Sequence, residues 1–524
     1  MSVFVKLFNS HPLSGGFTKK VNGRPVKITL PAHKAEPLNT QPIFPIITAL
    51  GVPPNLFTNG AASAFQITVP QGVSDVIHHI TLKVDITLNG SAQLVPVVNF
   101  FEKIELKTPS GVVLRTWYND SLMMSIGATT TNAMLLSLAK NLNIDTKDPT
   151  LYGMNPELPA GNYSFMLPLN SALWQEGLHW GAAKHDMVLH LSPDKTIVAA
   201  GAGIPTCNNI ALIIEGERLP ENMMSALEKY SRTAAPGVLF CEPTPCYAGN
   251  KPMQVGQNLI DLSNLSGRVA FLQLLIRPAG HTNVGNGHWK YLNIGDNQNA
   301  SIDVLNASSS SVMGGTPIPS KYIKNELWMH NFNNSHSACK SVYMIPHSTD
   351  IAGNFQGKFH GYREYISGQK DQLQINCAAP INEVQTLTPS TASLDGGRFQ
   401  FCFRGELSES LPVTATTAAM SAAIAKMRVF ERNSITAVFS KLLSAAGPTT
   451  VTFTTPETNG LEGDLLTVVG NVALGAVAAG VTTTITTAGR DGLVPGNYDI
   501  VVYGYVIKVC TFAGGELTVD GWVG

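Results

Sequence analysis

The stretch His79-Ile-Thr-Leu-Lys-Val-Asp-Ile-Thr-Leu88 decides the fold class of this chain. Its even-numbered positions from Ile80 to Leu88 are all apolar, and the positions between them are Thr, Lys, Asp and Thr. An alternation of period two is typical of a strand that buries one face and exposes the other. Asn89-Gly90 follows at once, and this dipeptide favours the tight turns of hairpins. The stretch therefore predicts a half-buried strand that ends in a turn.

Similar patterns extend through a first β-rich region of about 60–235. Its further strand candidates are Phe100–Lys107, Val112–Tyr118, Tyr163–Leu169, Asp186–Leu191 and Asn209–Glu215. A helix-like stretch, Asp120–Leu142, interrupts them, because Leu135, Leu138 and Leu142 share one helical face. The region is expected to form one β domain.

A second β-rich region, about 258–410, repeats the order of the first. Its strand candidates are Leu259–Leu262, Val269–Arg277, Glu326–Asn331, Ser341–Ile345, Gln372–Asn376 and Phe399–Arg404. In each region the last strand runs into a Gly-Glu pair and a helix, at Gly216-Glu217 and at Gly405-Glu406. The second of these helices is Ala-rich and centred on Met420 and Ile424. We therefore predict two similar β domains, each closed by a short helix.

The remaining segments differ from these two domains. The prolines of residues 1–45 are expected to prevent regular structure in a basic N-terminal arm. Prolines and glycines mark 236–257 as a linker. The last part, 433–524, is expected to be a small β-rich appendage that begins with a helix-like stretch, Ser434–Ala446.

Charge is scarce in the chain and almost balanced. Lys and Arg number 35 and Asp and Glu 36, so the net charge is −1, and charged residues make up 14% of the chain against about 25% in typical proteins. Interface cores are depleted in charge, so this composition favours surfaces that become buried in an assembly, although a large β protein with neutral loops has the same composition. The chain also lacks the excess of Lys and Arg that nucleic-acid phosphates require, and no specific nucleic-acid partner is expected.

The cysteines predict synthesis in a reducing compartment. There are seven, an odd number, and no Cys-x-x-Cys occurs, which argues against a disulfide framework and against a zinc ribbon. Residues 1–10 lack the apolar core of a signal peptide. Synthesis in a cytoplasm is therefore expected.

Over roughly residues 60–430 the pattern resembles the double jelly-roll major capsid proteins of tailless icosahedral double-stranded DNA viruses, many of which enclose an internal membrane. The resemblance rests on the duplicated β region, the linker, the basic arm and the strand-then-helix ends at Ile210–Tyr230 and Phe399–Met427. The stretch Phe355-Gln-Gly-Lys-Phe-His-Gly-Tyr362, before Gln372-Leu-Gln-Ile375, is similar to that family's aromatic and glycine loop between late strands. No short diagnostic motif accompanies it.

The fold implied by the resemblance is all-β. Two consecutive eight-stranded antiparallel jelly rolls with short flanking helices are expected at 46–235 and 258–432, and a small C-terminal β domain at 433–524. The appendage is a departure from the family pattern. Long loops at 120–160 and 281–320 are expected to form outward towers or subunit contacts.

The resemblance also implies a structural role in the virion, with synthesis in the host cytoplasm and no enzymatic activity. Three copies form a homotrimeric capsomer of pseudo-sixfold outline, since each chain supplies two similar domains. The implied partners are neighbouring capsomers, minor capsid and penton proteins and, where the virus has one, an internal lipid membrane. The basic side chains of the arm are candidate inner-face or membrane-proximal contacts, with a solvated tail as the equal alternative: Lys6, Lys19, Lys20, Arg24 and Lys27.

No catalytic, cofactor or metal site is expected. The chain contains no Gly-x-Ser-x-Gly, His-Glu-x-x-His, Walker loop or Asp-x-Asp-x-Asp-Gly calcium loop. His78 and His79 point to opposite faces of one strand, which disfavours joint metal binding. The spacing of His179, His185 and His190 matches no zinc pattern, and Asp296 lies in a stretch typical of turns. Four aromatic residues form either a binding platform or, as is more usual, β core: Trp289, Tyr291, Trp328 and Tyr343.

Two other functions remain open at this stage. A glycan-binding protein or glycan-releasing hydrolase can also be built on jelly rolls, and a hydrolase requires two carboxylates in one cleft. The acidic candidates are Asp186, Glu215, Glu217, Glu364 and Asp371, which the sequence alone does not bring together. A minor capsid or spike protein is the other alternative, for which an appendage at 434–524 is suited.

Overall fold

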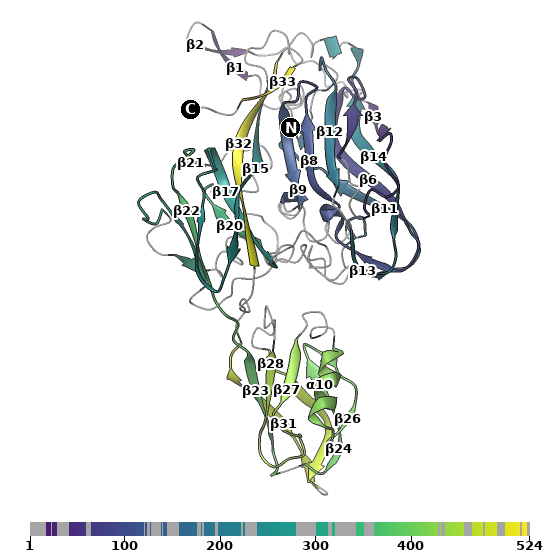
Figure 1. Ribbon diagram of the computed structural model, residues 1–524, viewed down its shortest axis with the longest axis vertical. Helices are drawn as coiled ribbons and strands as arrows, with labels where there is room; N and C mark the ends of the chain where they lie inside the picture. Colours follow the sequence, from purple (N-terminus) through teal and green to yellow (C-terminus); the bar gives the residue numbers. More distant parts are fainter. Residues whose placement is uncertain are drawn as a thin grey trace.

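The structure is a computed structural model of the 524-residue chain. It describes residues 17–21, 24–28, 41–58, 64–119, 121–122, 126, 138, 140–143, 157–175, 180, 183–193, 197–221, 224–225, 238–278, 300–312, 317–319, 342–349, 361–392, 394–427, 430, 435–454, 464–474, 477–489, 498–513 and 516–520. These residues form two β-sandwiches side by side and a third β domain at one end of the molecule (Figure 1).

The first sandwich consists of two antiparallel sheets. One has the order β11-β6-β14, with β4 and β3 both paired to the far side of β14, and the other has the order β5-β12-β8-β9. The strands are β3 (Gln41–Ile43), β4 (Ile46–Thr48), β5 (Phe65–Val69), β6 (Val76–Leu88), β8 (Phe101–Lys107), β9 (Val113–Tyr118), β11 (Gly161–Pro168), β12 (Met187–Pro193) and β14 (Pro205–Arg218). The predicted alternation is confirmed in β6, whose apolar positions from Ile80 to Leu88 are buried.

The order of these strands is that of a jelly roll. Counted along the chain from β4, with β3 taken as an extension of the same edge, the described strands number eight, and the two sheets have the orders 1-8-3-6 and 2-7-4-5. This winding of two Greek keys defines the jelly roll. Short elements complete the first roll: η1 (Val97–Asn99), α5 (Ala172–Gln175) and a small sheet of β10 (Glu157–Leu158), β7 (Ala92–Leu94) and β13 (Val198–Gly201).

The second sandwich repeats the order 1-8-3-6 and 2-7-4-5 among its described strands. Its sheets are β15-β32-β17-β20 and β16-β22-β18-β19, with β21 and β33 paired to β17 and β32. The strands are β15 (Val238–Met253), β16 (Gly256–Asp261), β17 (Gly267–Pro278), β18 (Ser301–Leu305), β19 (Ile318–Pro319), β20 (Val342–Pro346), β21 (Arg363–Tyr365), β22 (Gln372–Cys377), β32 (Tyr498–Ala513) and β33 (Glu516–Asp520). The prediction of two consecutive eight-stranded antiparallel jelly rolls is confirmed.

The third β domain, residues 383–487, lies between the seventh and eighth strands of the second roll, and we call it the inserted domain. Its sheets are β27-β28-β23-β31 and β25-β24-β29-β30, with β26 paired to β24. Its elements are β23 (Glu383–Pro389), β24 (Gly396–Phe403), β25 (Glu406–Leu407), β26 (Leu411–Pro412), α10 (Thr417–Ala425), β27 (Thr436–Phe439), β28 (Thr449–Thr454), β29 (Thr467–Leu474), β30 (Val477–Ala479) and β31 (Val481–Thr487). The predicted Ala-rich helix is α10, which buries Met420 and Ile424 in this domain's own core.

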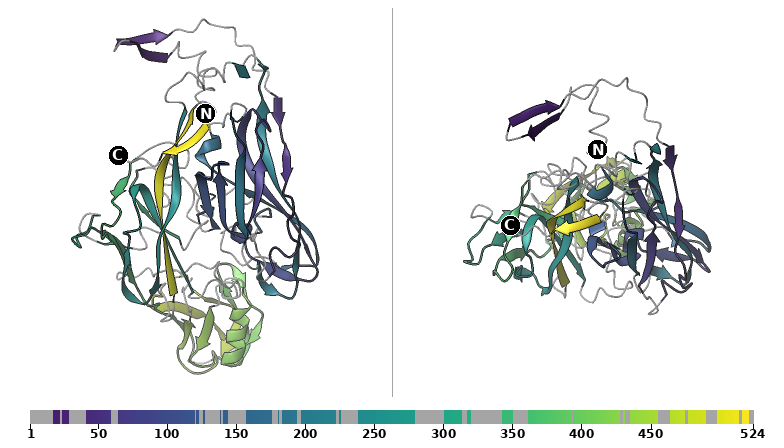
Figure 2. Two further views of the ribbon diagram at one scale, coloured as in Figure 1. Left: turned by 45° about the horizontal axis from the view of Figure 1, so that its top comes forward. Right: turned by 90° about the horizontal axis from the view of Figure 1, so that it is seen from above.

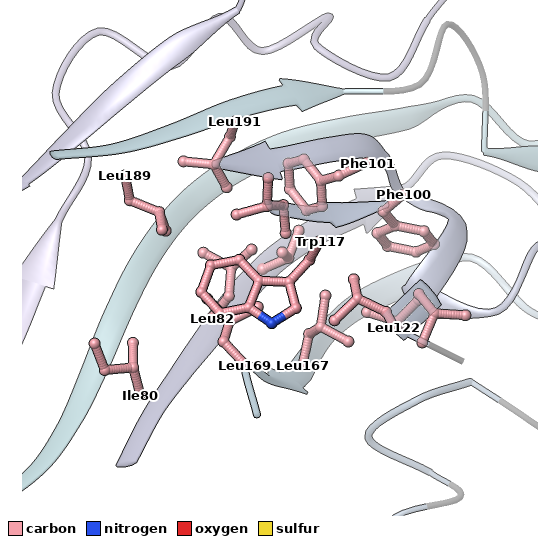
Figure 3. Packing of buried hydrophobic residues seen from close by; sticks show 14 of the residues in the cluster. Ile80, Leu82, Phe100, Phe101, Trp117, Leu122, Leu167, Leu169, Leu189 and Leu191 are labelled. Carbon is pink, nitrogen blue, oxygen red and sulfur yellow. The ribbon is translucent and has the colours of Figure 1, made fainter. Parts of the chain in front are cut away.

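Large aromatic side chains fill the core of the first roll. Figure 3 shows Trp117 among leucines from both sheets, with Phe100 and Phe101 beside it. The Trp117 indole N–H donates to the carbonyl of Asn170 at 2.8 Å, and its ring stacks on Trp174 with centroids 6.1 Å apart. A buried indole donor is therefore satisfied within the fold.

The two rolls are joined by an apolar interface. The outer face of the β15-β32-β17-β20 sheet packs against β9 and α5 of the first roll, and its side chains belong to the first roll's hydrophobic cluster. Tyr503 lies against Tyr118 of β9, and Phe271 stacks on Tyr505 with centroids 4.0 Å apart. The Tyr505 hydroxyl donates to Gln273 Oε1 at 2.6 Å inside this interface. The strands β17 and β32 are thus buried on both faces.

The predicted linker at 236–257 is wrong, because most of it forms the sixteen-residue strand β15. This strand is at the edge of its sheet and pairs only with β32 among the described strands. Pro243, Pro245 and Pro252 all lie opposite odd-numbered residues of β32. All three therefore occupy the same kind of position in the alternating hydrogen-bond pattern between the two strands. An edge strand tolerates proline where the missing N–H would point away from its neighbour.

The strand pairing also differs from the predicted boundaries at 258–432 and 433–524. Phe399–Arg404, expected to close the second roll, lies largely in β24, which pairs with β29 of the inserted domain. The closing strand is instead β32, which pairs with β15 and β17. The small β domain is therefore an insertion and not a C-terminal appendage.

Two further expectations from local sequence are wrong. The helix-like stretch Ser434–Ala446 contains the strand β27, in which Ala437 and Phe439 are buried while Thr436 and Val438 are exposed. Pairing with β28 outweighs the local helical pattern. The arm, expected to be irregular, contains a hairpin of β1 (Phe17–Val21) and β2 (Arg24–Ile28).

Most of the predicted helix Asp120–Leu142 lies outside the described residues, as do the greater part of the loops 120–160 and 281–320. The hairpin of β1 and β2 lies at the end of the molecule opposite the inserted domain (Figures 1 and 2). The hairpin and the inserted domain therefore mark the two ends of the long axis of the molecule.

Candidate assembly surfaces

The first roll has a sheet face equivalent to the one that the second roll buries against it. In the second roll, the outer face of the 1-8-3-6 sheet is covered by the first roll. In the first roll, the outer face of the corresponding sheet of β11, β6, β14 and β4 lies on the far side of the molecule from the second roll (Figure 1). We call this surface the free face.

An apolar strip lies along the β4 edge of the free face. Ile46 is 64% exposed and lies directly opposite Ile213 of β14, which is half-buried. Phe44 and Leu50, on either side of β4, are 63% and 90% exposed. Exposed apolar residues scattered singly are ordinary, but three large ones within seven residues at a sheet edge are typical of an interaction surface.

A cluster of polar side chains lies near the middle of the free face, and its members pair with one another. Lys83 Nζ lies 2.9 Å from Asp85 Oδ2, and the Asn209 amide donates to the same oxygen at 3.3 Å. Burial raises the pKa of Asp85, but the hydrogen bonds from Lys83, Ser164 and Asn209 outweigh it and hold the pKa below its ordinary value. The charges of this cluster are therefore paired before any partner covers the face.

The basic residues predicted as inner-face contacts gather on one hairpin. Lys19 and Lys20 lie on β1, and Arg24 and Lys27 lie on β2. The register pairs Lys19 with Val26 and Thr18 with Lys27. Lys6 lies outside the described residues. Within 17–28 the sequence has four basic residues and no acidic one.

The described candidate histidines are accounted for by contacts with nearby acidic side chains, by strand pairing or by exposure to solvent. His78 Nε2 lies 3.2 Å from Glu217 Oε1, and burial lowers the pKa of His79, opposed by Glu215. His185 is exposed, and His190 of β12 pairs with Glu105 of β8. His179 and Asp296 lie outside the described residues, among which no group of three metal-binding side chains occurs.

The candidate acids are also accounted for individually. Asp186 Oδ1 accepts from the backbone N–H of Gln71 at 2.7 Å. Asp371 accepts from Arg363 at 2.9 Å, and the Arg363 guanidinium lies over the Tyr365 ring. Glu364 is exposed on β21, where its backbone pairs with that of Arg268. Each of these contacts joins an acid to a different partner, so none of them brings two of the three acids together.

The proposed aromatic platform is not supported by the described part of the chain. Tyr343 is buried in the core of the second roll. Trp289, Tyr291 and Trp328 lie outside the described residues. In the part of the chain that the structure describes, no helix has the length and apolar content needed to span a membrane.

Comparison with solved structures identifies the fold. No protein-family model and no curated protein matches the sequence. The crystal structure of PBCV-1 VP54, fitted into a cryo-EM reconstruction of the virophage Sputnik, aligns with a TM-score of 0.52 and 12% identity over 92% of this chain and 97% of that chain. The quasi-atomic model of the PBCV-1 virus capsid aligns with a TM-score of 0.51, 12% identity and the same coverage. This chain has the double jelly-roll fold. The Faustovirus major capsid protein aligns at a TM-score of 0.48 with 8% identity, over 88% of this chain and 93% of that one.

The double jelly-roll fold expected from the resemblance is therefore confirmed. Sequence reasoning did not find the free face, because the residues that form its apolar strip lie in a segment divided between the predicted arm and the first domain. The apolar run Phe44 to Leu50 was the available indication, since it places large apolar residues next to the prolines of a segment expected to be irregular.

Proposed function

We propose that this protein is the major capsid protein of an icosahedral virus, a structural component of the virion without enzymatic activity. The observation that carries the proposal is the duplication: two jelly rolls of identical strand order lie side by side, and the sheet face that one roll buries is not covered on the other by any described strand or helix. The second roll buries this face within the chain, so the corresponding face of the first roll is suited to pack against another copy of the protein.

The homotrimer follows from applying the same interface a second time. Within the chain, the 1-8-3-6 sheet face of the second roll packs against the β9 side of the first roll. The free face of the first roll would pack in the same way against the β19 side of the second roll in a neighbouring copy. Such a head-to-tail interface generates a ring when the rotation closes, and three chains give six rolls around one axis. The strip of Phe44, Ile46 and Leu50 supplies the apolar contact.

The two ends of the molecule suggest its orientation in a shell. The hairpin with Lys19, Lys20, Arg24 and Lys27 lies at one end and the inserted domain at the other. Basic residues near a surface attract anionic lipid headgroups. We therefore place the hairpin on the inside, against an internal membrane or neighbouring subunits, and the inserted domain on the outside.

The alternatives have less support. A glycan-releasing hydrolase would need two carboxylates in one cleft, and three of the described candidate acids, Asp371, Glu217 and Asp186, already contact Arg363, His78 and a backbone amide. A spike or minor capsid protein was suggested by a terminal appendage, but the inserted domain belongs within the second roll. Neighbouring capsomers and penton proteins are partners expected of a capsid subunit.

The test is the mass of the purified protein in solution, measured by light scattering coupled to size exclusion. One chain is 56.0 kDa, so the trimer has about three times that mass, 168 kDa. We expect a single species at the trimer mass that persists on dilution and in high salt, because its interfaces are largely apolar and neutral. A stable 56.0 kDa monomer under all conditions would overturn the trimer and weaken the capsid proposal.

A further inference from the structure

A pocket lies at the end of the second roll from which the inserted domain emerges. Its volume is about 760 Å³, within the range of small-molecule sites. Three parts of the chain form its walls: the turn between β15 and β16, the first residue of β18, and the segment that leads from β22 into the inserted domain.

The walls of this pocket are fixed by hydrogen bonds. Asn258 is buried, and its amide nitrogen donates to the carbonyls of Gln254 and Gly256 at 2.8 and 3.1 Å, while its Oδ1 accepts from the Gln254 N–H. The turn between β15 and β16 is thereby held in one conformation. Asn376 of β22 donates to the Ser301 hydroxyl of β18 at 2.9 Å across the sheet. The site is therefore formed before any ligand arrives, which lowers the entropic cost of binding.

The described residues that line the pocket include no Lys, Arg, His, Asp or Glu. Its one ionisable group is the Cys377 thiol, and burial raises the pKa of that thiol to about 12, so it remains neutral. A phosphate, sulfate or carboxylate ligand would find no cation among these residues to pair with. The chemistry of the pocket selects an uncharged ligand.

The polar and apolar parts of the lining match the two surfaces of a sugar ring. The hydrogen bond between Asn376 and Ser301 leaves the Asn376 carbonyl oxygen able to accept and the Ser301 hydroxyl able to donate. An acceptor and a donor side by side can bind two adjacent hydroxyls. Val255, Pro380 and Ile381 offer apolar surface to the C–H face of the ring, and Ile381 is 42% exposed.

We propose that this pocket binds a neutral sugar residue of a surface glycan, through Asn376, Ser301 and the apolar wall at Pro380 and Ile381. The inference rests on the proposed capsid function for its biological setting, because that function places this end of the molecule on the outside of the shell. Binding of the sugar itself depends only on the pocket.

The experiment is saturation-transfer NMR on the full-length assembled protein. The neutral probes are the methyl glycosides of glucose, galactose, mannose and N-acetylglucosamine, and the charged probes are N-acetylneuraminic acid and inorganic phosphate. We expect at least one neutral probe to bind and both charged probes to fail. Asn376→Ala should weaken the neutral probe about tenfold, since it removes one direct hydrogen bond and releases Ser301.

Two further variants keep the test decisive. Ala379 is exposed at the pocket, so Ala379→Trp should block it without disturbing the core and abolish binding. Gln374→Ala, on the same strand and two residues from Asn376 but outside the pocket, is the matched control and should leave binding unchanged. The proposal is overturned if no neutral probe binds, if a charged probe binds in preference, or if Gln374→Ala weakens binding as much as Asn376→Ala. The solution mass, measured on the same samples, reports separately on the capsomer.

Discussion

Replacing Ile46 by aspartate should separate the capsomer into single chains. Ile46 is 64% exposed at the β4 edge of the free face, so Ile46→Asp leaves the fold of the first roll intact. In the proposed trimer the same side chain is buried against a neighbouring copy. The substitution therefore tests the interface without testing the core.

The size of the effect follows from the exposed fractions. Phe44, Ile46 and Leu50 together expose about two full apolar side chains, and burying one contributes about 1.5–3 kcal/mol. The share of Ile46 is about 1–2 kcal/mol at each interface. An aspartate placed there would lose this contribution and add the cost of burying an unpaired carboxylate, at least about 2 kcal/mol. A loss of about 3 kcal/mol or more per interface corresponds to a weakening of each contact by more than about 100-fold.

The assay is light scattering coupled to size exclusion at equal protein concentration. We expect the variant to elute at 56.0 kDa, with a circular dichroism spectrum and thermal midpoint like those of the parent protein. Val438→Asp is the matched control, since Val438 is a 56% exposed β-branched residue on the inserted domain, and it should stay trimeric. A fully folded Ile46→Asp trimer of undiminished stability on dilution would refute the assignment of the free face as the interface.

Three other outcomes are expected. Tyr505→Phe removes the donor to buried Gln273 and should destabilise the contact between the rolls by about 1–3 kcal/mol, seen as a lower urea midpoint for the transition that separates them. Replacing residues 383–487 by a short Gly-Ser segment should leave a folded double jelly roll of reduced mass, since the inserted domain has its own core; an insoluble product with unpaired β15 and β17 would contradict this. Burial and the nearby Arg363 lower the pKa of His347 to about 3, so the unfolded chain binds a proton that the folded chain does not between that pH and about 6.5. Stability should therefore fall on acidification in this window by up to about 1.4 kcal/mol per pH unit, and His347→Gln should flatten the slope measured by chemical denaturation.

Local patterns predicted the strands but not their pairing. The alternation in His79–Leu88 and the duplicated order of elements were sufficient to predict two similar β domains, and the resemblance supplied the jelly-roll topology. The predicted linker failed because proline is unfavourable in most strands, and only the sheet order shows that β15 is an edge strand where proline is tolerated. Ser434–Ala446 failed for a similar reason, because β27 depends on its partner β28.

The largest error concerned the eighth strand of the second roll. Phe399–Phe403 and β32 are both rich in apolar residues, and Phe399–Phe403 comes where a closing strand is expected in the chain. What distinguishes them is that β32 is apolar on both faces, since it must fill the middle of a sheet that is covered on one side by its own roll and on the other by the first roll. That requirement arises from the tertiary arrangement. The apolar strip of the free face likewise depends on which sheet face the chain itself leaves uncovered.

The position of β32 also has a consequence for synthesis. The ribosome makes β15 and β17 first, then the entire inserted domain, and it reaches β32 only after the 120 residues that separate Cys377 from Tyr498. Translation proceeds at about 5–20 residues per second, so β15 and β17 of the nascent second roll remain without the strand that separates them for about 6–24 s. Unpaired strand edges of this kind are prone to aggregation and are recognised by chaperones. Translation itself thus controls the order of maturation: the first roll and the inserted domain can fold early, whereas the surface that joins the two rolls exists only after β32 has left the ribosome, and a prematurely terminated chain would lack it.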